Sequence, residues 1–228
     1  MNDKNMISPK RYAPREVKFD CTQCDLENLE RIKDHIAKHI VPVSWVWGEI
    51  AFSLIHLDVL IIEPSDERPC YTLVTSGMSQ KPMTSPPPGF ERAKYSELVL
   101  HLPPDWLMHE PELQKAENFW PIQVIKHVAR FPHVFDTWLW WTQTVHNEEP
   151  YHPSTPFAGA MLLQETPYDR DFLLMETDRE ESTVFHSLVL LHQAELDYYI
   201  LHGYQALMDA LTKQGLRHVV DPQRPSAV

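Results

Sequence analysis

The sequence predicts an α+β fold, in which a mixed, largely antiparallel β-sheet is flanked by α-helices. Short segments rich in β-branched and aromatic residues, bounded by Pro, Gly and Asp, recur through the chain and are typical of strands. Helical periodicity occurs near the beginning, the middle and the end instead of alternating regularly with these segments, which favours α+β over a doubly wound fold. With 228 residues, of which 43% are hydrophobic, the chain can bury a sizeable core.

The first predicted helix starts at residue 25. Asp25 can accept a hydrogen bond from the first turn, and Pro42 follows the end of the helix. Apolar residues recur at intervals of three and four and so form one buried face, namely Leu26, Leu29, Ile32, Ile36 and Ile40. Residues 1–24 are polar and show no sustained period. We therefore expect an N-terminal extension over 1–24 and a single domain over 25–228.

The predicted strands are apolar and β-branched runs between turn residues. They cover residues 44–52, 55–62, 70–76, 93–102, 137–145, 157–164 and 183–191, with a shorter strand near Phe172. Within 55–62 the alternation places one set of apolar residues on a common face, namely Ile55, Leu57, Val59 and Ile61. Residues 77–92 are rich in Pro, which predicts a long, exposed loop.

Two further helices are predicted. Asn118 can cap the second, Pro121 suits its first turn, and Pro132 is expected to end it. The third begins at His192, and Gly215 stands where a left-handed residue ends a helix. Its apolar stripe consists of Leu196, Ile200, Gly203, Leu207 and Leu211.

The charge of the chain predicts the kind of partner. Lys and Arg total 20 against 32 Asp and Glu, a formal net charge of −12. Such a surface repels phosphate backbones and anionic lipids, which argues against nucleic acid and membrane partners, and it attracts a basic protein. The N-terminus has no apolar signal segment, and no apolar run is long enough to span a membrane, so we expect a cytoplasmic protein.

The sequence offers little for catalysis. Six Gly are too few and too scattered for a loop that cradles phosphate, and no nucleophile elbow occurs. The hydroxyls of residues 75–79 have no identifiable base beside them. We expect no enzyme activity and no cofactor.

A zinc site is the main alternative. Cys21 and Cys24 are followed by His35 and His39, at spacings that thiolate and imidazole ligands of tetrahedral zinc can adopt. If Asp25 caps a continuous helix, His35 lies roughly 15 Å along the axis from Cys24, too far to share one ion. We therefore expect ordinary half-exposed histidines and no metal.

A second group of possible metal ligands lies in the predicted strands. His56 and Asp58 share one strand face, and Glu97 and His101 can share another. The same residues suit a buried His–Asp hydrogen bond that organises the sheet, which is the reading we favour. Trp138, Trp140 and Trp141 are expected on both faces of a strand, either in the core or as an accessible anchor for a partner.

The chain resembles the Suppressor of fused (SUFU) family, bacterial single-domain type. The matching segments are residues 55–59 (IHLDV), 67–79 (ERPCYTLVTSGMS), 81–83 (KPM), 95–98 (YSEL), 102–106 (LPPDW), 120–122 (WPI), 129–133 (ARFPH), 136–139 (DTWL) and 221–225 (DPQRP). The resemblance implies a mixed sheet with flanking helices and a non-catalytic role. For bacterial members this is an immunity or antitoxin role against a secreted toxin, often a nuclease, whereas the animal relative sequesters a transcription factor in Hedgehog signalling.

The resemblance also implies a binding site. In the animal relative an extended partner peptide is held beside the segment that follows the Ala-Arg-aromatic motif, in the manner of strand addition. The matching residues here are Phe131, Gln143, Thr144, Val145 and His146. Gln143 stands near the place of an acidic residue in the animal domain, and we expect no second domain to complete the groove. We expect a monomer or weak dimer that binds a basic toxin or peptide segment. An intracellular regulatory scaffold unrelated to toxins is an alternative that neither the sequence nor the charge separates from this role.

Overall fold

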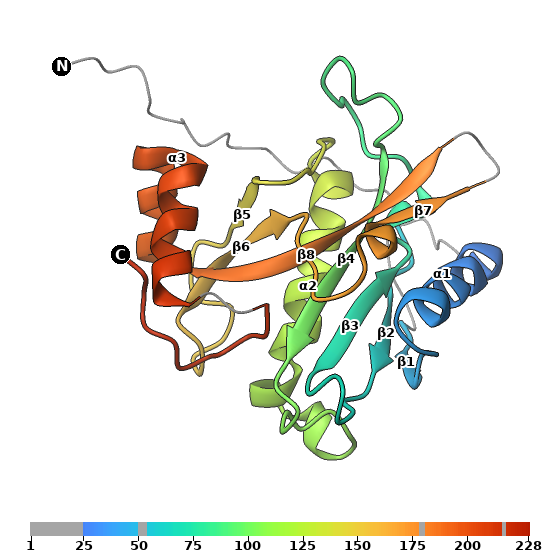
Figure 1. The fold of residues 1–228 in the computed structure, drawn as a ribbon, viewed down its shortest axis with the longest axis horizontal. Coiled ribbons are helices and arrows are strands. Elements are labelled where there is room, and N and C mark those ends of the chain that lie inside the picture. The colour runs from blue at the N-terminus through green and yellow to red at the C-terminus, as the bar shows by residue number, and fades with distance from the viewer. Residues whose placement is uncertain (1–24, 50–53, 178–180, 216–217) are drawn as a thin grey trace.

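The computed structural model describes residues 25–49, 54–177, 181–215 and 218–228 (Figure 1). Its helices are α1 (Leu26–His39), α2 (Ala116–Val134) and α3 (Gln193–Gln214), with short 3₁₀ turns η1 (Met78–Gln80), η2 (Glu112–Gln114) and η3 (Arg170–Leu173). Its strands are β1 (Trp45–Trp47), β2 (Asp58–Ile62), β3 (Tyr71–Ser76), β4 (Tyr95–Leu102), β5 (Thr144–His146), β6 (Phe157–Leu163), β7 (Leu174–Glu176) and β8 (Ser182–His192). None of the helices in this described part is long and apolar enough to cross a membrane.

The strands form one sheet in the order β1-β2-β3-β4-β8-β6-β5, and β7 also pairs with β8. β4 and β8 run parallel, and every other pair in the described residues is antiparallel. β8 is long enough to take β7 at its beginning and β6 at its end, both along the same edge. The predicted fold class, a mixed and largely antiparallel sheet flanked by helices, is confirmed.

The helices cover both faces of the sheet (Figure 1). Leu188 and Leu190 of β8 belong to the core cluster that includes the buried side of α2. The alternate residue Phe185 packs with α1, and Val189 with α3. Because successive residues of a strand face opposite sides, α2 covers one face and α1 and α3 share the other.

The first helix and the second strand agree with the predicted patterns in part: Leu26, expected on the buried face of the helix, is 68% exposed, and β2 begins at Asp58 instead of residue 55. Asp25 caps α1 by accepting a hydrogen bond from the backbone N of Asn28 at 3.1 Å. Ile32 and Ile36 are fully buried on its inner face. The expected common face of Ile55, Leu57, Val59 and Ile61 lies in the core beneath α2.

The second helix differs from the prediction at both ends. It begins at Ala116, so Asn118 is not its cap, and the amide of that side chain donates to the carbonyl of Glu112. Pro132 lies inside the helix instead of ending it. A proline inside a helix removes the bond from its own N–H and crowds the carbonyl four residues before it. Here the last turn still closes through the bond from Phe135 N to Phe131 O at 3.1 Å.

The predicted strand over 137–145 is wrong for most of its length. Only Thr144–His146 forms β5, and Asp136 and Thr142 have positive φ values of 45° and 67°. Residues 138–141 form an irregular segment in which the rings of Trp138 and Trp140 stack at 5.2 Å. The aromatic residues of this segment therefore pack their rings on each other instead of pairing in a strand. Strand propensity alone cannot distinguish these two arrangements, because aromatic residues favour both.

The third helix has the predicted end and an unpredicted break. Gly215 has φ 81° and ψ 49°, the left-handed conformation expected there. Gly203 also has a positive φ of 81°, with ψ 176°, and interrupts the helix in its middle. Leu196, Leu207 and Leu211 are buried, as predicted for the stripe, on either side of this break.

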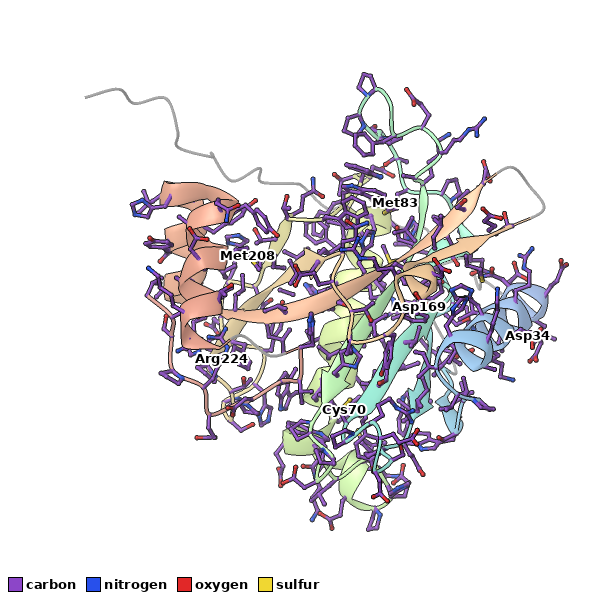
Figure 2. The ribbon with its side chains drawn as sticks, in the orientation of Figure 1. Asp34, Cys70, Met83, Asp169, Met208 and Arg224 are labelled. Atoms are coloured by element: carbon purple, nitrogen blue, oxygen red, sulfur yellow. The ribbon has the colours of Figure 1, made fainter. Side chains whose placement is uncertain are left out.

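The C-terminal segment is fastened to the start of α3 by Arg224, which Figure 2 labels. Its guanidinium binds the carboxylate of Glu195, whose side chain is fully buried, at 2.5 and 2.6 Å, and the carbonyl of Leu190 at 2.8 Å. It also lies 5.1 Å from the ring centroid of Phe157. Burial alone would raise the pKa of Glu195, but Arg224 and neighbouring N–H donors hold it below its usual value. Arg224 is thus one residue of the family-like segment 221–225 with a clear structural role.

We predict that Arg224→Gln lowers the free energy of unfolding by about 3 kcal/mol, because it leaves the buried Glu195 carboxylate without its cation. Chemical denaturation measures this change. Lys33→Gln is the matched control: Lys33 pairs at 2.8 Å with Glu30, whose side chain is 63% exposed. That change should cost no more than about 0.5 kcal/mol. Equal effects of the two substitutions would contradict a special role for the C-terminal segment.

Candidate functional site

Glu97 of β4 is fully buried and is the centre of a hydrogen-bond network. Its Oε2 accepts from Oγ1 of Thr75 at 2.6 Å. Its Oε1 accepts from the backbone N of Gly77 at 2.9 Å, and from the N and Oγ of Ser79 at 2.9 and 2.6 Å. Burial raises the pKa of Glu97, and the bonds from Ser79 and Thr75 oppose that rise. The hydroxyls of Thr75 and Ser79 therefore serve a buried carboxyl group in the core.

Gly77 has no possible replacement in this network. Its φ is 126°, and a Cβ built on it would lie 1.7 Å from the carbonyl oxygen of His56. The tight turn at Gly77 aims two backbone N–H groups at Glu97, and the Oγ of Ser79 also accepts from the Asn28 amide of α1 at 2.9 Å. The network thus connects β3, β4 and α1.

A second polar cluster joins the strands to α2. Glu49 pairs with Lys126 at 2.7 Å and with Arg130, both on α2. Burial alone would raise the pKa of Glu49, but Lys126 and Arg130 bring it below its usual value. The Nε2 of His56 bonds to Oδ1 of Asp58 at 2.8 Å, which confirms the expected His–Asp hydrogen bond. These groups hold the sheet and the helix together.

Among the residues considered as zinc ligands, the described histidine His35 makes other contacts. Cys21 and Cys24 lie outside the described residues. The Nε2 of His35 donates to the carbonyl of Phe172 at 2.9 Å, and its ring stacks on that of Phe185 at 5.2 Å. Over the residues that the structure describes, no group of three or more His, Cys, Asp or Glu side chains could hold a metal ion.

The other proposed ligand group is also divided. His56 and Asp58 bond to each other, Glu97 bonds to Thr75 and Ser79, and the Nδ1 of His101 pairs with the Oγ1 of Thr72 at 3.2 Å. Glu97 and His101 do lie on one strand, as expected, but each is enclosed by different neighbours. The structure does not bring the four side chains together.

The predicted partner-binding residues occupy two elements. Phe131 lies on α2, half-buried against the core of that face. Gln143 comes just before β5, and its Oε1 accepts from the backbone N of Trp140 at 2.7 Å. Thr144, Val145 and His146 are β5, the last strand of the sheet, so the structure places four of the five at one sheet edge.

The backbone of β5 has an unpaired side. Leu162 N donates to Gln143 O at 3.0 Å, and Asn147 N donates to Ala158 O at 2.7 Å, so Gln143 and Asn147 face β6. By the alternation of an antiparallel pair, the N–H and C=O groups of Thr144 and His146 point away from β6. No backbone hydrogen bond from the described chain reaches those groups on the outer side.

The side chains of β5 point to both faces. Val145 is 1% exposed and packs in the core beneath α2. Thr144 and His146 face the side of α3, where their Oγ1 and Nε2 lie 3.0 Å apart. Burial lowers the pKa of His146, and the carboxylate of Asp197 on α3 opposes this effect.

Sequence reasoning missed a cleft of about 1150 Å³ beside β7. Its walls come from α1, the segment of Trp140 and Trp141, η3, β7 and Tyr204 of α3. Because these segments are far apart along the chain, no local pattern could have indicated the cleft.

The protein is an α+β domain with one sheet. Its buried polar groups hold strands and helices together, and β5 forms an unpaired edge of the sheet in the described residues. The family model described as Suppressor of fused protein (SUFU) matches residues 53–225. That range is well over half of the chain, and this protein belongs to the SUFU family.

Solved structures of the family share the fold. A Neisseria gonorrhoeae FA 1090 protein described as a SUFU homologue superposes with a TM-score of 0.63 and 15% identity, over 89% of this chain and 98% of that chain. A chain of the Sufu–Fu complex superposes with a TM-score of 0.59 and 14% identity, over 88% of this chain and 92% of that chain. Drosophila Suppressor of Fused superposes with a TM-score of 0.58 and 10% identity, over 89% of this chain and 51% of that chain.

A relative by sequence is the uncharacterized protein UU111 of Ureaplasma parvum serovar 3. It is 26% identical over 133 residues, which are 58% of this chain and 62% of the relative. The chain therefore spans about three fifths of the length of that relative.

We predict that Gly77→Ala lowers the free energy of unfolding by at least ~3 kcal/mol, because the new methyl group collides with the His56 carbonyl in a strained backbone. Gly89→Ala is the matched control, since Gly89 also has a positive φ, of 91°, but no atom within 4 Å of a built Cβ. It should cost about 1 kcal/mol. Thermal or urea unfolding compares them, and equal losses would contradict the importance of the Glu97 network.

We predict that acid destabilises the fold through two buried histidines. Burial lowers the pKa of His101 to about 3 and the pKa of His186 to about 3, from 6.5 in the unfolded chain. Between pH 6.5 and 3 only the unfolded state takes up these two protons, so stability falls as pH falls, by up to about 1.4 kcal/mol per pH unit for each histidine.

Urea unfolding at a series of pH values measures this slope. His101→Gln and His186→Gln should each reduce the slope by about one proton, whatever they do to stability at pH 7. An unchanged slope in both variants would show that other groups cause the acid sensitivity.

Proposed function

We propose that this protein is a non-catalytic protein-binding domain of the immunity or antitoxin type, which binds and masks a basic protein in the cytoplasm. Membership of the SUFU family supports the binding role, and the Sufu–Fu complex shows that a protein of this family forms a complex with another protein. The net charge of −12 supports a basic partner, because opposite charge speeds association. We take residues 25–228 as the binding domain and 1–24 as an extension.

The observation that carries the proposal is the open edge at β5. The outward backbone groups of Thr144 and His146 can pair with an extended segment of the partner, which would continue the sheet beyond β5. Gln143 precedes this edge, and Val145 anchors it in the core beneath α2. Phe131 on α2 packs against the same core cluster as Val145.

The surroundings of β5 favour a cationic segment. Glu148 and Glu149 are exposed just after the strand, and the exposed Asp197 lies near His146. Cross-strand and neighbouring opposite charges stabilise a strand pair, whereas like charges oppose it. A segment with Lys or Arg beside the β5 edge therefore fits this surface better than an acidic one.

The test is to capture partners with the full chain, identify the basic protein that binds, and measure its affinity for two variants at His146. His146→Pro removes the outward N–H of the edge and should weaken binding at least about tenfold, because a proline cannot donate to an added strand. His146→Ala removes the same side chain but keeps the N–H, and it should change the affinity much less.

Both variants must keep the thermal stability of the parent chain within a few degrees for the comparison to be valid. The association rate should also fall steeply as salt rises, because screening weakens the attraction between opposite net charges. If the partner binds His146→Pro as tightly as it binds the parent chain, binding by strand addition at β5 is wrong. If the association rate does not depend on salt, electrostatic capture of the partner is wrong.

A further inference from the structure

The cleft beside β7 lies at a sheet edge. β6 pairs with β8 from Ser187 to His192, and β7 pairs with it from Ser182 to Val184, both along the same side of β8. β5 continues the sheet beyond β6, but in the described residues no strand continues it beyond β7. In the described residues no strand lies next to β7, in line with β5. The backbone N–H of Leu174 already donates to the carbonyl of Asp171 in η3, so an added strand would pair with the other backbone groups of β7.

The walls of the cleft agree with this position. His35 and Lys38 of α1 line it from one face of the sheet. Trp140 lines it too, and that ring packs with the core of the opposite face. Because the cleft contacts α1 on one face of the sheet and Trp140 on the other face, it must pass the edge of the sheet. All three residues of β7 line the cleft.

β7 presents a definite chemical pattern to this space. Leu174 and Glu176 are exposed and Met175 is buried, so the first two share one face. Leu174 is 47% exposed, and over the described residues the carboxylate of Glu176 makes no ion pair or hydrogen bond. Met175 packs in the core cluster of α1, which places Leu174 and Glu176 on the face of Trp140.

We infer that the free edge of β7 binds an extended segment of a partner protein in which an apolar residue and a Lys or Arg are separated by one residue. The apolar residue lies opposite Leu174 and the cation opposite Glu176, since apolar and opposite-charge cross-strand pairs stabilise neighbouring strands. The intervening residue points to the α1 side and is polar, because Lys38, Arg170 and Asp171 line the cleft there. This inference rests on the proposed role in protein binding but assigns a second contact, separate from β5.

A second copy of this chain fits the edge less well. If two β7 strands paired antiparallel about Met175, each Leu174 would lie opposite a Glu176 of the other copy, which joins an apolar side chain to a charged one. The volume of about 1150 Å³ also exceeds the roughly 300–1,000 Å³ that is common for small-molecule sites. A partner segment of several residues suits both the volume and the pattern.

The first experiment selects ligands from a displayed library of random decapeptides with the full chain as bait. We expect enriched peptides with an apolar residue and a Lys or Arg two positions apart. Hydrogen exchange with a synthetic enriched peptide should then show protection of residues 174–176. If no peptide is enriched, or if protection appears only at β5, the β7 site is wrong.

The second experiment reverses the charge on both sides of the contact. Glu176→Lys should weaken the Lys-containing peptide about fivefold and strengthen the same peptide with Glu in place of Lys. Asp66→Lys, an exposed change in the turn between β2 and β3, is the matched control for net charge and should not change this preference. An identical effect of both substitutions would reduce the contact to general electrostatics and overturn the assignment.

Two further substitutions, together with His146→Pro, distinguish binding at the β7 edge from binding at the β5 edge. Leu174→Asn should weaken the peptide, whereas Leu201→Asn, at a residue of α3 with a similar exposure of 53%, should not. His146→Pro should leave peptide binding at β7 intact. If the peptide binds at β7 but no basic partner requires β5, the function proposed above fails at its own site while the β7 site stands.

Discussion

The buried carboxyl group of Glu97 is the constraint on which the centre of the structure depends. A carboxyl group inside a protein is costly unless donors surround it, and here the donors come from Thr75, Gly77 and Ser79. The chain must turn sharply at Gly77 to supply them, which fixes how β3 leads into η1. Asn28 then attaches α1 to the same turn through Ser79, so one polar centre sets the position of a helix and two strands.

The periphery of the sheet follows from this centre. Once β3 and β4 are fixed, β8 pairs with β4 in parallel and extends beyond it, so β6 and β7 can share one side of β8. In the part of the chain that the structure describes, this side ends at β5 and at β7 with no further strand beyond them. The segment of Trp138 and Trp140 runs between α2 and β5, and the ring of Phe90 packs on both indoles at 5.4 and 5.5 Å. Trp140 of this segment lines the cleft beside β7.

The sequence predicted the parts of the fold that depend on neighbours along the chain. Asp25 and the spacing of Ile32 and Ile36 gave α1 correctly, because capping and a 3.6-residue period are local properties. The strand predicted over 137–145 was wrong, and Pro132 did not end α2, because ring stacking and helix docking overrode local preference. Of the candidate site, the sequence could indicate β5 only through the resemblance.

The sequence by itself determined the periodic elements, the excess of negative charge and the family. The tertiary structure alone decided that Thr75 and Ser79 surround Glu97, that His101 pairs with Thr72 instead, and that a cleft lies beside β7. The reason is register. A shift of one residue in strand pairing turns every side chain to the opposite face, so contacts between strands are fixed only when all strands are packed together.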